Sequence, residues 1–209
     1  MPYLPQAVES VLAQSYSQLS WCVVDGESSD ESITYLNSVN DSRLRWYSTP
    51  KGWTPAARRN FGVLRTSGEL LAFLDSDDLL EPSGLAELCS ALTVPQQGIA
   101  VGGIRRFYQR GISPSDSPNI EYGPAIGNVL MSRQVFAQVG NLNEALVVGE
   151  FVEWMTRARN VGVKELLTST LVLHRREHDR NRSRLLKGAY GIDYPQILRE
   201  HLQRKRNTE

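Results

Sequence analysis

Three carboxylates stand within four residues, directly after a run of apolar residues. The run from Leu70 to Leu74 is followed by Asp75, Asp77 and Asp78. An apolar run of this length is typical of a strand buried on both faces, and ligands bind open α/β sheets at the carboxyl ends of strands. Carboxylates this close repel one another unless a cation lies among them, and Mg²⁺ prefers oxygen ligands. The stretch predicts a metal–phosphate site, with an acidic turn that caps the next helix as the alternative.

The elements that must position these carboxylates alternate between strands and helices. Strand patterns occupy residues 20–25, 44–48, 69–74, 98–108, 127–131 and 165–173. Helical patterns occupy residues 3–16, 31–39, 55–66, 82–92, 133–139, 151–160 and 190–206. This order is typical of βαβ units, so we expect an α/β fold with a mostly parallel central sheet and helices on both faces. Residues 109–124 hold three prolines and are expected to form a surface loop.

Composition and charge fit one soluble globular domain. Of the 209 residues, 41% are apolar, and 23 basic residues balance 23 acidic ones, so the charge gives no indication of a nucleic-acid partner. No apolar run approaches the ~20 residues of a membrane span. Two cysteines, Cys22 and Cys89, make no disulfide framework and fit buried thiols in a reducing compartment. We therefore expect a cytoplasmic protein.

Four segments, in order along the chain, resemble glycosyltransferase family 2. They are residues 3–16 (YLPQAVESVLAQSY), 23–26 (VVDG), 59–62 (RNFG) and 68–78 (GELLAFLDSDD). The resemblance runs over nearly the whole chain and is dense up to about residue 85. It implies a single GT-A (Rossmann-like) domain over residues 1–209, with a nucleotide-sugar half (1–95), an acceptor half (96–184) and a C-terminal helical tail (185–209).

The resemblance implies roles for residues at the strand ends. Asp25 would accept a hydrogen bond from a pyrimidine base. Because Gly26 stands where the family often has a second Asp, this contact rests on Asp25 or shifts to Glu27. Arg59 would stack on or pair with the nucleotide, and a solvated basic face is the alternative. Asp75 would contact ribose or sugar hydroxyls or the metal.

The resemblance also implies a cation site for Mg²⁺ or Mn²⁺. Asp77 is the best single ligand, with Asp75 and His178 as further ligands. Arg176, Glu177 and His178 match the Arg-x-His that many family members carry after the last strand. In such a site Arg176 would touch the diphosphate of the donor. A solvated charged segment is the alternative for this arginine-rich run.

The base of the implied reaction is harder to assign. Residues 149–157 (GEFVEWMTR) resemble a Glu-Asp-x-x-x-x-x-Arg stretch, but Phe151 stands in the place of the Asp. Glu150 is the first candidate base and Glu153 the second, and capping of the helix is the alternative for both.

The implied reaction is inverting transfer of a sugar from a UDP-sugar to a hydroxyl of a glycan, lipid or peptide. The alternative is a truncated or degenerate relative that binds a nucleotide or a partner without turnover.

Both ends of the chain carry expectations of their own. The family begins with an apolar strand, whereas this chain starts within the first helix. We expect the sheet to lack that strand, which leaves two neighbouring strands with unpaired backbone groups. A version extended upstream would then be more stable and active. The basic tail at 190–206 would lie on an anionic membrane surface, on the domain itself or on a second copy in a homodimer.

Overall fold

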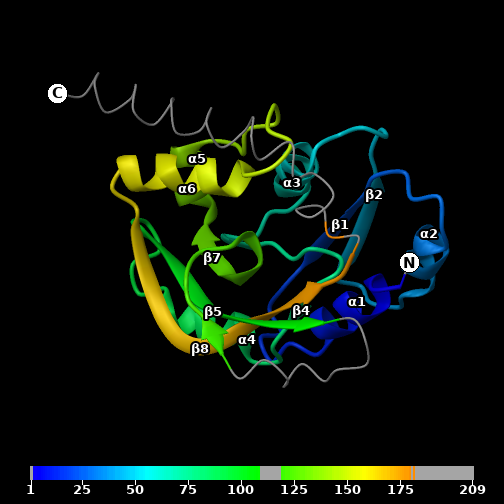
Figure 1. Ribbon diagram of the computed structural model, residues 1–209, viewed down its shortest axis with the longest axis horizontal. Coiled ribbons are helices and arrows are strands. Elements are labelled where there is room, and N and C mark those ends of the chain that lie inside the picture. The colour runs from blue at the N-terminus through cyan, green and yellow to red at the C-terminus, as the bar shows by residue number, and fades with distance from the viewer. Residues whose placement is uncertain (1, 109–118, 180, 182–209) are drawn as a thin grey trace.

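The computed structural model describes residues 2–108, 119–179 and 181 (Figure 1). The helices are α1 (Leu4–Leu12), α2 (Ser32–Ser38), α3 (Pro55–Leu64), α4 (Gly84–Ala91), α5 (Arg133–Val139) and α6 (Glu150–Asn160), with a 3₁₀ turn η2 (Ile126–Asn128). The strands are β1 (Trp21–Asp25), β2 (Leu44–Ser48), β3 (Leu70–Ala72), β4 (Leu79–Leu80), β5 (Gly98–Tyr108), β6 (Ile120–Glu121), β7 (Val129–Ser132) and β8 (Lys164–Glu177).

The strands form two sheets. β1 and β2 pair in parallel, and the larger sheet has the order β3-β7-β5-β8-β4 with β6 beside β5. The α/β class is confirmed, but the mostly parallel sheet needs correction, because in the larger sheet only β5 and β8 run parallel. Parallel neighbours need a long crossover, usually a helix. No α-helix lies between β5 and β7 in the part of the chain that the structure describes, and these two strands run antiparallel.

The two sheets share no strand pair among the described residues. β1 pairs with β2 alone, and β3 pairs with β7 alone. The Trp21 N–H donates to the Arg43 carbonyl and the Thr49 N–H to the Asp25 carbonyl, so alternate residues of β1 face β2. The backbone groups of Cys22 and Val24 face the opposite edge, where no described strand pairs with them. This agrees with the expected lack of the first strand.

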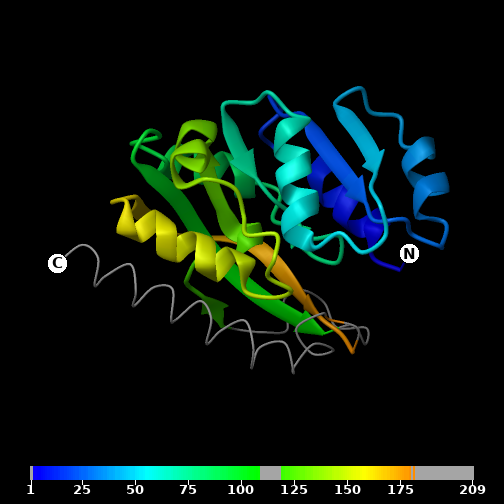
Figure 2. The same ribbon diagram turned by 90° about the horizontal axis from the view of Figure 1, so that it is seen from above.

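Helices cover both faces of the larger sheet. Figure 2 shows one of these faces, with the yellow helix α6 lying across the strands. One core cluster joins α3, α5 and α6 to β5 and β7, and a second joins α4 to β4, β5 and β8. Trp154 lies at the centre of the first cluster. Its ring stacks on Phe136 and Phe151 at centroid distances of 5.8 and 5.9 Å, and its indole N–H donates to the Gly140 carbonyl at 2.8 Å.

Two helix starts matter for the site. Helix α3 begins at Pro55, and the Thr54 hydroxyl accepts a hydrogen bond from the Ala57 N–H at 3.2 Å, an N-cap that fixes the helix on β1. Helix α6 follows Gly149, whose φ of 78° lies in the left-handed region that glycine adopts without strain. This turn makes Glu150 the first residue of α6, one residue earlier than predicted.

Candidate functional site

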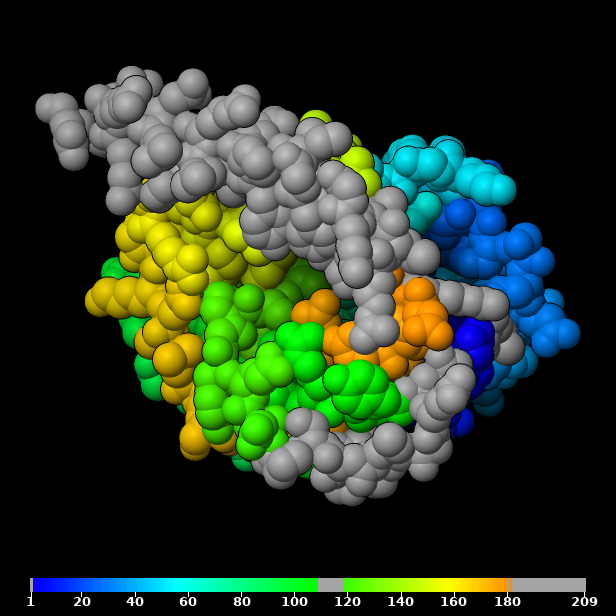
Figure 3. Space-filling view, viewed as in Figure 1, coloured from blue at the N-terminus to red at the C-terminus, as the bar shows by residue number. Residues whose placement is uncertain are grey.

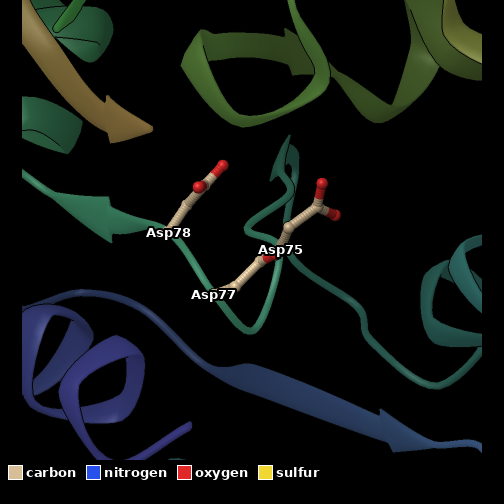
Figure 4. Close-up of side chains that lie close together, drawn as sticks. All are labelled: Asp75, Asp77 and Asp78. Atoms are coloured by element: carbon tan, nitrogen blue, oxygen red, sulfur yellow. The ribbon is translucent and has the colours of Figure 1, made fainter. Parts of the chain in front are cut away.

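The acidic turn, residues 75–78, joins β3 to β4. Oxygen atoms of Asp75, Asp77 and Asp78 all lie within 4.8 Å of one another (Figure 4). The turn is tight because the Asp78 N–H donates to the Asp75 carbonyl at 3.1 Å. The prediction that the three carboxylates follow a strand agrees with this geometry. The predicted extent needs correction, because β3 ends at Ala72, two residues before the predicted end, and Ala72 is exposed, so the strand is not buried on both faces.

The negative charge of the acidic turn is poorly compensated. Burial, and next the charges of Asp75 and Asp77, raise the pKa of Asp78 to about 8, against the hydrogen bond from the Arg176 N–H and the charge of Arg175, which lower it. A divalent cation would offset this repulsion, and oxygen-only donors are those that Mg²⁺ and Mn²⁺ prefer. The residues present therefore fit a site for a hard divalent cation.

Strand β8 and the residues after it hold the acidic turn from one side. The Arg176 N–H donates to Asp78 Oδ1 at 2.8 Å, and Arg176 Nε donates to the Asp77 carbonyl at 2.8 Å. His178 Nε2 lies 3.1 Å from Asp77 Oδ2. The structure thus brings Arg176 and His178 to the acidic turn. It places Arg176 within β8, which continues to Glu177, four residues beyond the predicted strand end.

Arg59 joins the acidic turn to the start of α6. Its Nη2 donates to Asp75 Oδ1 at 2.5 Å and its Nη1 to Glu150 Oε1 at 2.6 Å. Burial opposes the charge of Arg59, but the two carboxylates outweigh it and raise the pKa of the guanidinium. Three predicted site residues are therefore brought together, with both terminal nitrogens of Arg59 occupied by carboxylates.

Glu153 pairs with a residue of its own helix. It is buried and forms an ion pair with Arg157 at 2.8 Å. Arg157 also donates to the carbonyls of Val139 and Asn141, so the pair ties α6 to the end of α5. We do not retain Glu153 as a candidate base. Residue 151 is a buried phenylalanine, so the position at which the family usually has an aspartate offers no carboxylate.

The carboxyl end of β1 carries the second predicted part of the site. Asp25 is buried and accepts hydrogen bonds from the Ser28 N–H at 2.9 Å and from the Ser28 hydroxyl at 2.5 Å. Glu27 is exposed, with a φ of 58°. The guanidinium of Arg58 lies against Gly26, where a Cβ would come within 2.2 Å of Arg58 Nη2. The sequence assigned no role to Arg58, because only the fold shows its packing on residue 26.

The fold is of the GT-A type, as the comparison with solved structures shows. The crystal structure of residues 1–349 of TarS from S. aureus, in complex with UDP-GlcNAc, superposes with a TM-score of 0.71 at 15% identity. That match covers 87% of this chain and 56% of the other. A further structure of S. aureus TarS gives a TM-score of 0.64 at 15% identity and covers 97% of this chain and 41% of that one. Glycosyl transferase family 2 matches residues 1–142, and the chain belongs to this family.

Sequence relatives agree with this membership. An uncharacterized glycosyltransferase of Haemophilus influenzae is 39% identical over 80 residues, which are 37% of this chain and 32% of that protein. The succinoglycan biosynthesis protein ExoO of Rhizobium meliloti is 31% identical over 96 residues, 46% of this chain and 28% of its own. Chondroitin synthase of Pasteurella multocida is 35% identical over 89 residues, 42% of this chain and 9% of its own. The chain thus spans at most about a third of these relatives.

Within residues 2–108, 119–179 and 181, no helix is long and apolar enough to cross a membrane. The tail helix predicted at 190–206 lies outside the described residues. Its membrane, domain or second-subunit contact stays a prediction. The division into halves at residues 95 and 184 and the cytoplasmic location also stay predictions.

Proposed function

We propose that this protein transfers a sugar from a nucleotide-sugar, a UDP-sugar, to an acceptor hydroxyl on a glycan, lipid or peptide. The reaction inverts the anomeric carbon and depends on Mg²⁺ or Mn²⁺. The observation that carries this proposal is the convergence of three carboxylates within 4.8 Å on one turn of a family 2 glycosyltransferase. UDP-GlcNAc in the complex of TarS, which shares the fold, supports the donor class.

The acidic turn would bind the diphosphate end of the donor through the cation. Asp75 and Asp77 are the proposed ligands, with Asp78 and His178 beside them. A bound divalent cation neutralises the charge that the nucleoside diphosphate gains as the glycosidic bond breaks. At the end of β1, the buried carboxylate of Asp25 would accept from the base, with Glu27 at the rim.

Glu150 is the proposed base. Its carboxylate stands at the N-terminus of α6, where the helix dipole stabilises the charged form that accepts a proton. Arg59 holds Glu150 and Asp75 on the same guanidinium, so the candidate base lies beside the proposed donor site. In a single displacement, Glu150 takes the proton of the attacking hydroxyl as the hydroxyl oxygen bonds to the anomeric carbon and the diphosphate leaves.

Phe151 favours a second candidate function, that of a relative which binds a nucleotide without turnover. The side chain stacks on Trp154 in the core, with an angle of 8° between the rings. A residue packed in this way contributes nothing to proton transfer. The second candidate keeps the acidic turn and the Asp25 end of β1 but lacks an effective base.

Titration calorimetry with UDP, in EDTA and in Mn²⁺, separates the candidates when it is followed by a UDP-release assay on a panel of UDP-sugars. The transferase binds UDP only in Mn²⁺ and releases UDP from at least one donor. Mn²⁺-dependent binding without release from any donor supports the second candidate. Failure to bind UDP in Mn²⁺ overturns both candidates.

A further inference from the structure

The guanidinium of Arg176 is enclosed by groups of this chain. The residue is 6% exposed, and its Cζ lies 4.6 Å from the ring centroid of Tyr3 and 4.5 Å from that of Phe107. Arginine stacks favourably on aromatic rings in this way. Its Nη2 donates to Gln6 Oε1 at 2.5 Å. Arg176 therefore joins the start of α1 to the central strands β5 and β8.

The same residue bonds twice to the acidic turn. Arg176 Nε donates to the carbonyl of Asp77 and the Arg176 N–H to a carboxylate oxygen of Asp78, both at 2.8 Å. On the other side, the Arg176 carbonyl accepts from Asn181 Nδ2 at 3.0 Å. One side chain thus fixes the backbone of Asp77, and one backbone N–H fixes the carboxylate of Asp78.

We propose that Arg176 is a positioning residue that ties the acidic turn to Tyr3, Gln6 and Phe107. It holds the carboxylates of Asp77 and Asp78 in the arrangement that takes a divalent cation, and it does not contact the donor. This inference rests on the cation site of the proposed function. It replaces the expectation that Arg176 binds the diphosphate, because Nε and Nη2 already donate within the chain and an aromatic ring lies close to the guanidinium on each of two sides.

Arg176→Lys tests the geometry while it keeps the positive charge. A lysine ammonium is a point charge on a flexible stem and does not reproduce the planar fork that reaches both Asp77 and Gln6. Arg106→Lys is the matched control. Arg106 lies on β5 and pairs with Glu121 at 2.7 Å and Glu177 at 2.6 Å, so the control also replaces an arginine with two partners on this sheet.

We would titrate the full chain with Mn²⁺ in the absence of nucleotide and monitor free Mn²⁺ by its electron paramagnetic resonance signal. The unfolding temperature of each variant is measured in the same buffer. Outer residues that orient metal ligands typically contribute 10- to 100-fold in affinity. Arg176→Lys is therefore expected to raise the Kd for Mn²⁺ by about 10- to 100-fold. Arg106→Lys should leave the Kd within about twofold of the wild type, because neither Glu121 nor Glu177 belongs to the acidic turn.

A second variant covers the case in which Arg176→Lys does not fold. Gln6→Met removes one hydrogen bond to Arg176 and leaves the acidic turn unchanged. It is expected to raise the Kd for Mn²⁺ by about 3- to 10-fold, the effect of one lost hydrogen bond. If Arg176→Lys folds and its Kd for Mn²⁺ is unchanged, the inference is overturned. If only Gln6→Met folds, an unchanged Kd for Mn²⁺ in that variant overturns it.

Two further outcomes separate this inference from the proposed function. A UDP affinity at saturating Mn²⁺ that falls in Arg176→Lys, while the Kd for Mn²⁺ alone is unchanged, assigns Arg176 to the diphosphate and overturns the inference alone. A wild-type protein that binds no Mn²⁺ overturns the cation site and the inference with it.

Discussion

In the absence of divalent cations, Asp78→Asn is expected to stabilise the protein at pH 8. The carboxyl of Asp78 is buried beside Asp75 and Asp77, and its pKa rises from 3.8 to about 8 on folding. The folded state therefore holds a proton that the unfolded state releases. This stabilisation is fully present below pH 3.8 and is lost as the pH rises towards 8. Asparagine has nearly the same shape, and its Oδ1 still accepts from the Arg176 N–H.

The size of the effect follows from the two pKa values. For a single group with a pKa of 3.8 unfolded and about 8 folded, the free energy of unfolding falls by about 2 kcal/mol between pH 6 and pH 8. In a chain of this length, about 2 kcal/mol corresponds to roughly 4 to 8 °C in the unfolding temperature. Asp78→Asn removes this pH dependence. Between pH 6 and pH 8 the free energy of unfolding of the variant should therefore rise by about 2 kcal/mol relative to that of the wild type.

The difference in unfolding temperature is measured in EDTA at pH 6, 7 and 8, with circular dichroism as the readout. Asp41→Asn is the control. Hydrogen bonds from the Arg43 side chain and N–H lower the pKa of Asp41. A lowered pKa gives stability that is lost only as the pH falls through that value, so the control keeps the slope of the wild type between pH 6 and 8.

Parallel curves for wild type and Asp78→Asn between pH 6 and 8 would refute the reasoning, because they would mean that Asp78 does not carry the unfavourable charge. A cation adds a second test. Mn²⁺ should raise the unfolding temperature of the wild type at pH 8 more than that of Asp78→Asn, because only the wild type adds the negative charge of Asp78 to those of Asp75 and Asp77.

Three further substitutions test the site. Asp77→Ala should abolish Mn²⁺-dependent UDP binding in calorimetry, and retained binding would contradict the assignment of Asp77 as a ligand. Glu150→Gln should bind UDP in Mn²⁺ as the wild type does but lower kcat by about 10²- to 10⁴-fold; an unchanged kcat would remove Glu150 as the base. Phe151→Asp should unfold rather than gain activity, because it loses about 3–5 kcal/mol of aromatic packing and buries a charge beside Trp154; a folded, more active variant would show that residue 151 reaches the site.

The acidic turn could be predicted from the sequence because its signal is local. An apolar run and the three carboxylates after it lie within nine residues, although β3 itself ends at Ala72, before the run does. The start of α6 was predicted within one residue for the same reason. Resemblance to glycosyltransferase family 2 then placed these segments in one fold, and the match over residues 1–142 confirms the family.

The partners of Arg176 and Arg59 could not be predicted in this way. Arg176 lies on a strand only because β8 pairs with β5 up to Tyr108 and with β4 at Leu79, segments about 70 to 100 residues away in sequence. The charged residues around Arg176 are typical of a solvated segment, but pairing with β5 and β4 makes this segment part of a strand. Arg59 bonds to Glu150 across 91 residues, a contact that no spacing in the sequence indicates.

The rotation of α6 decides which residue is available as a base. Successive residues of a helix point about 100° apart, so Glu150 and Phe151 cannot face the same surroundings. Phe151 stacks on Trp154 in the core, and Glu150 reaches Arg59 and, through it, Asp75. A carboxylate placed at residue 151 would point into the core unless α6 turned, and Trp154 and the ion pair of Glu153 with Arg157 oppose that turn. Of the carboxylates on α6, Glu150 is therefore the one placed to act as the proposed base.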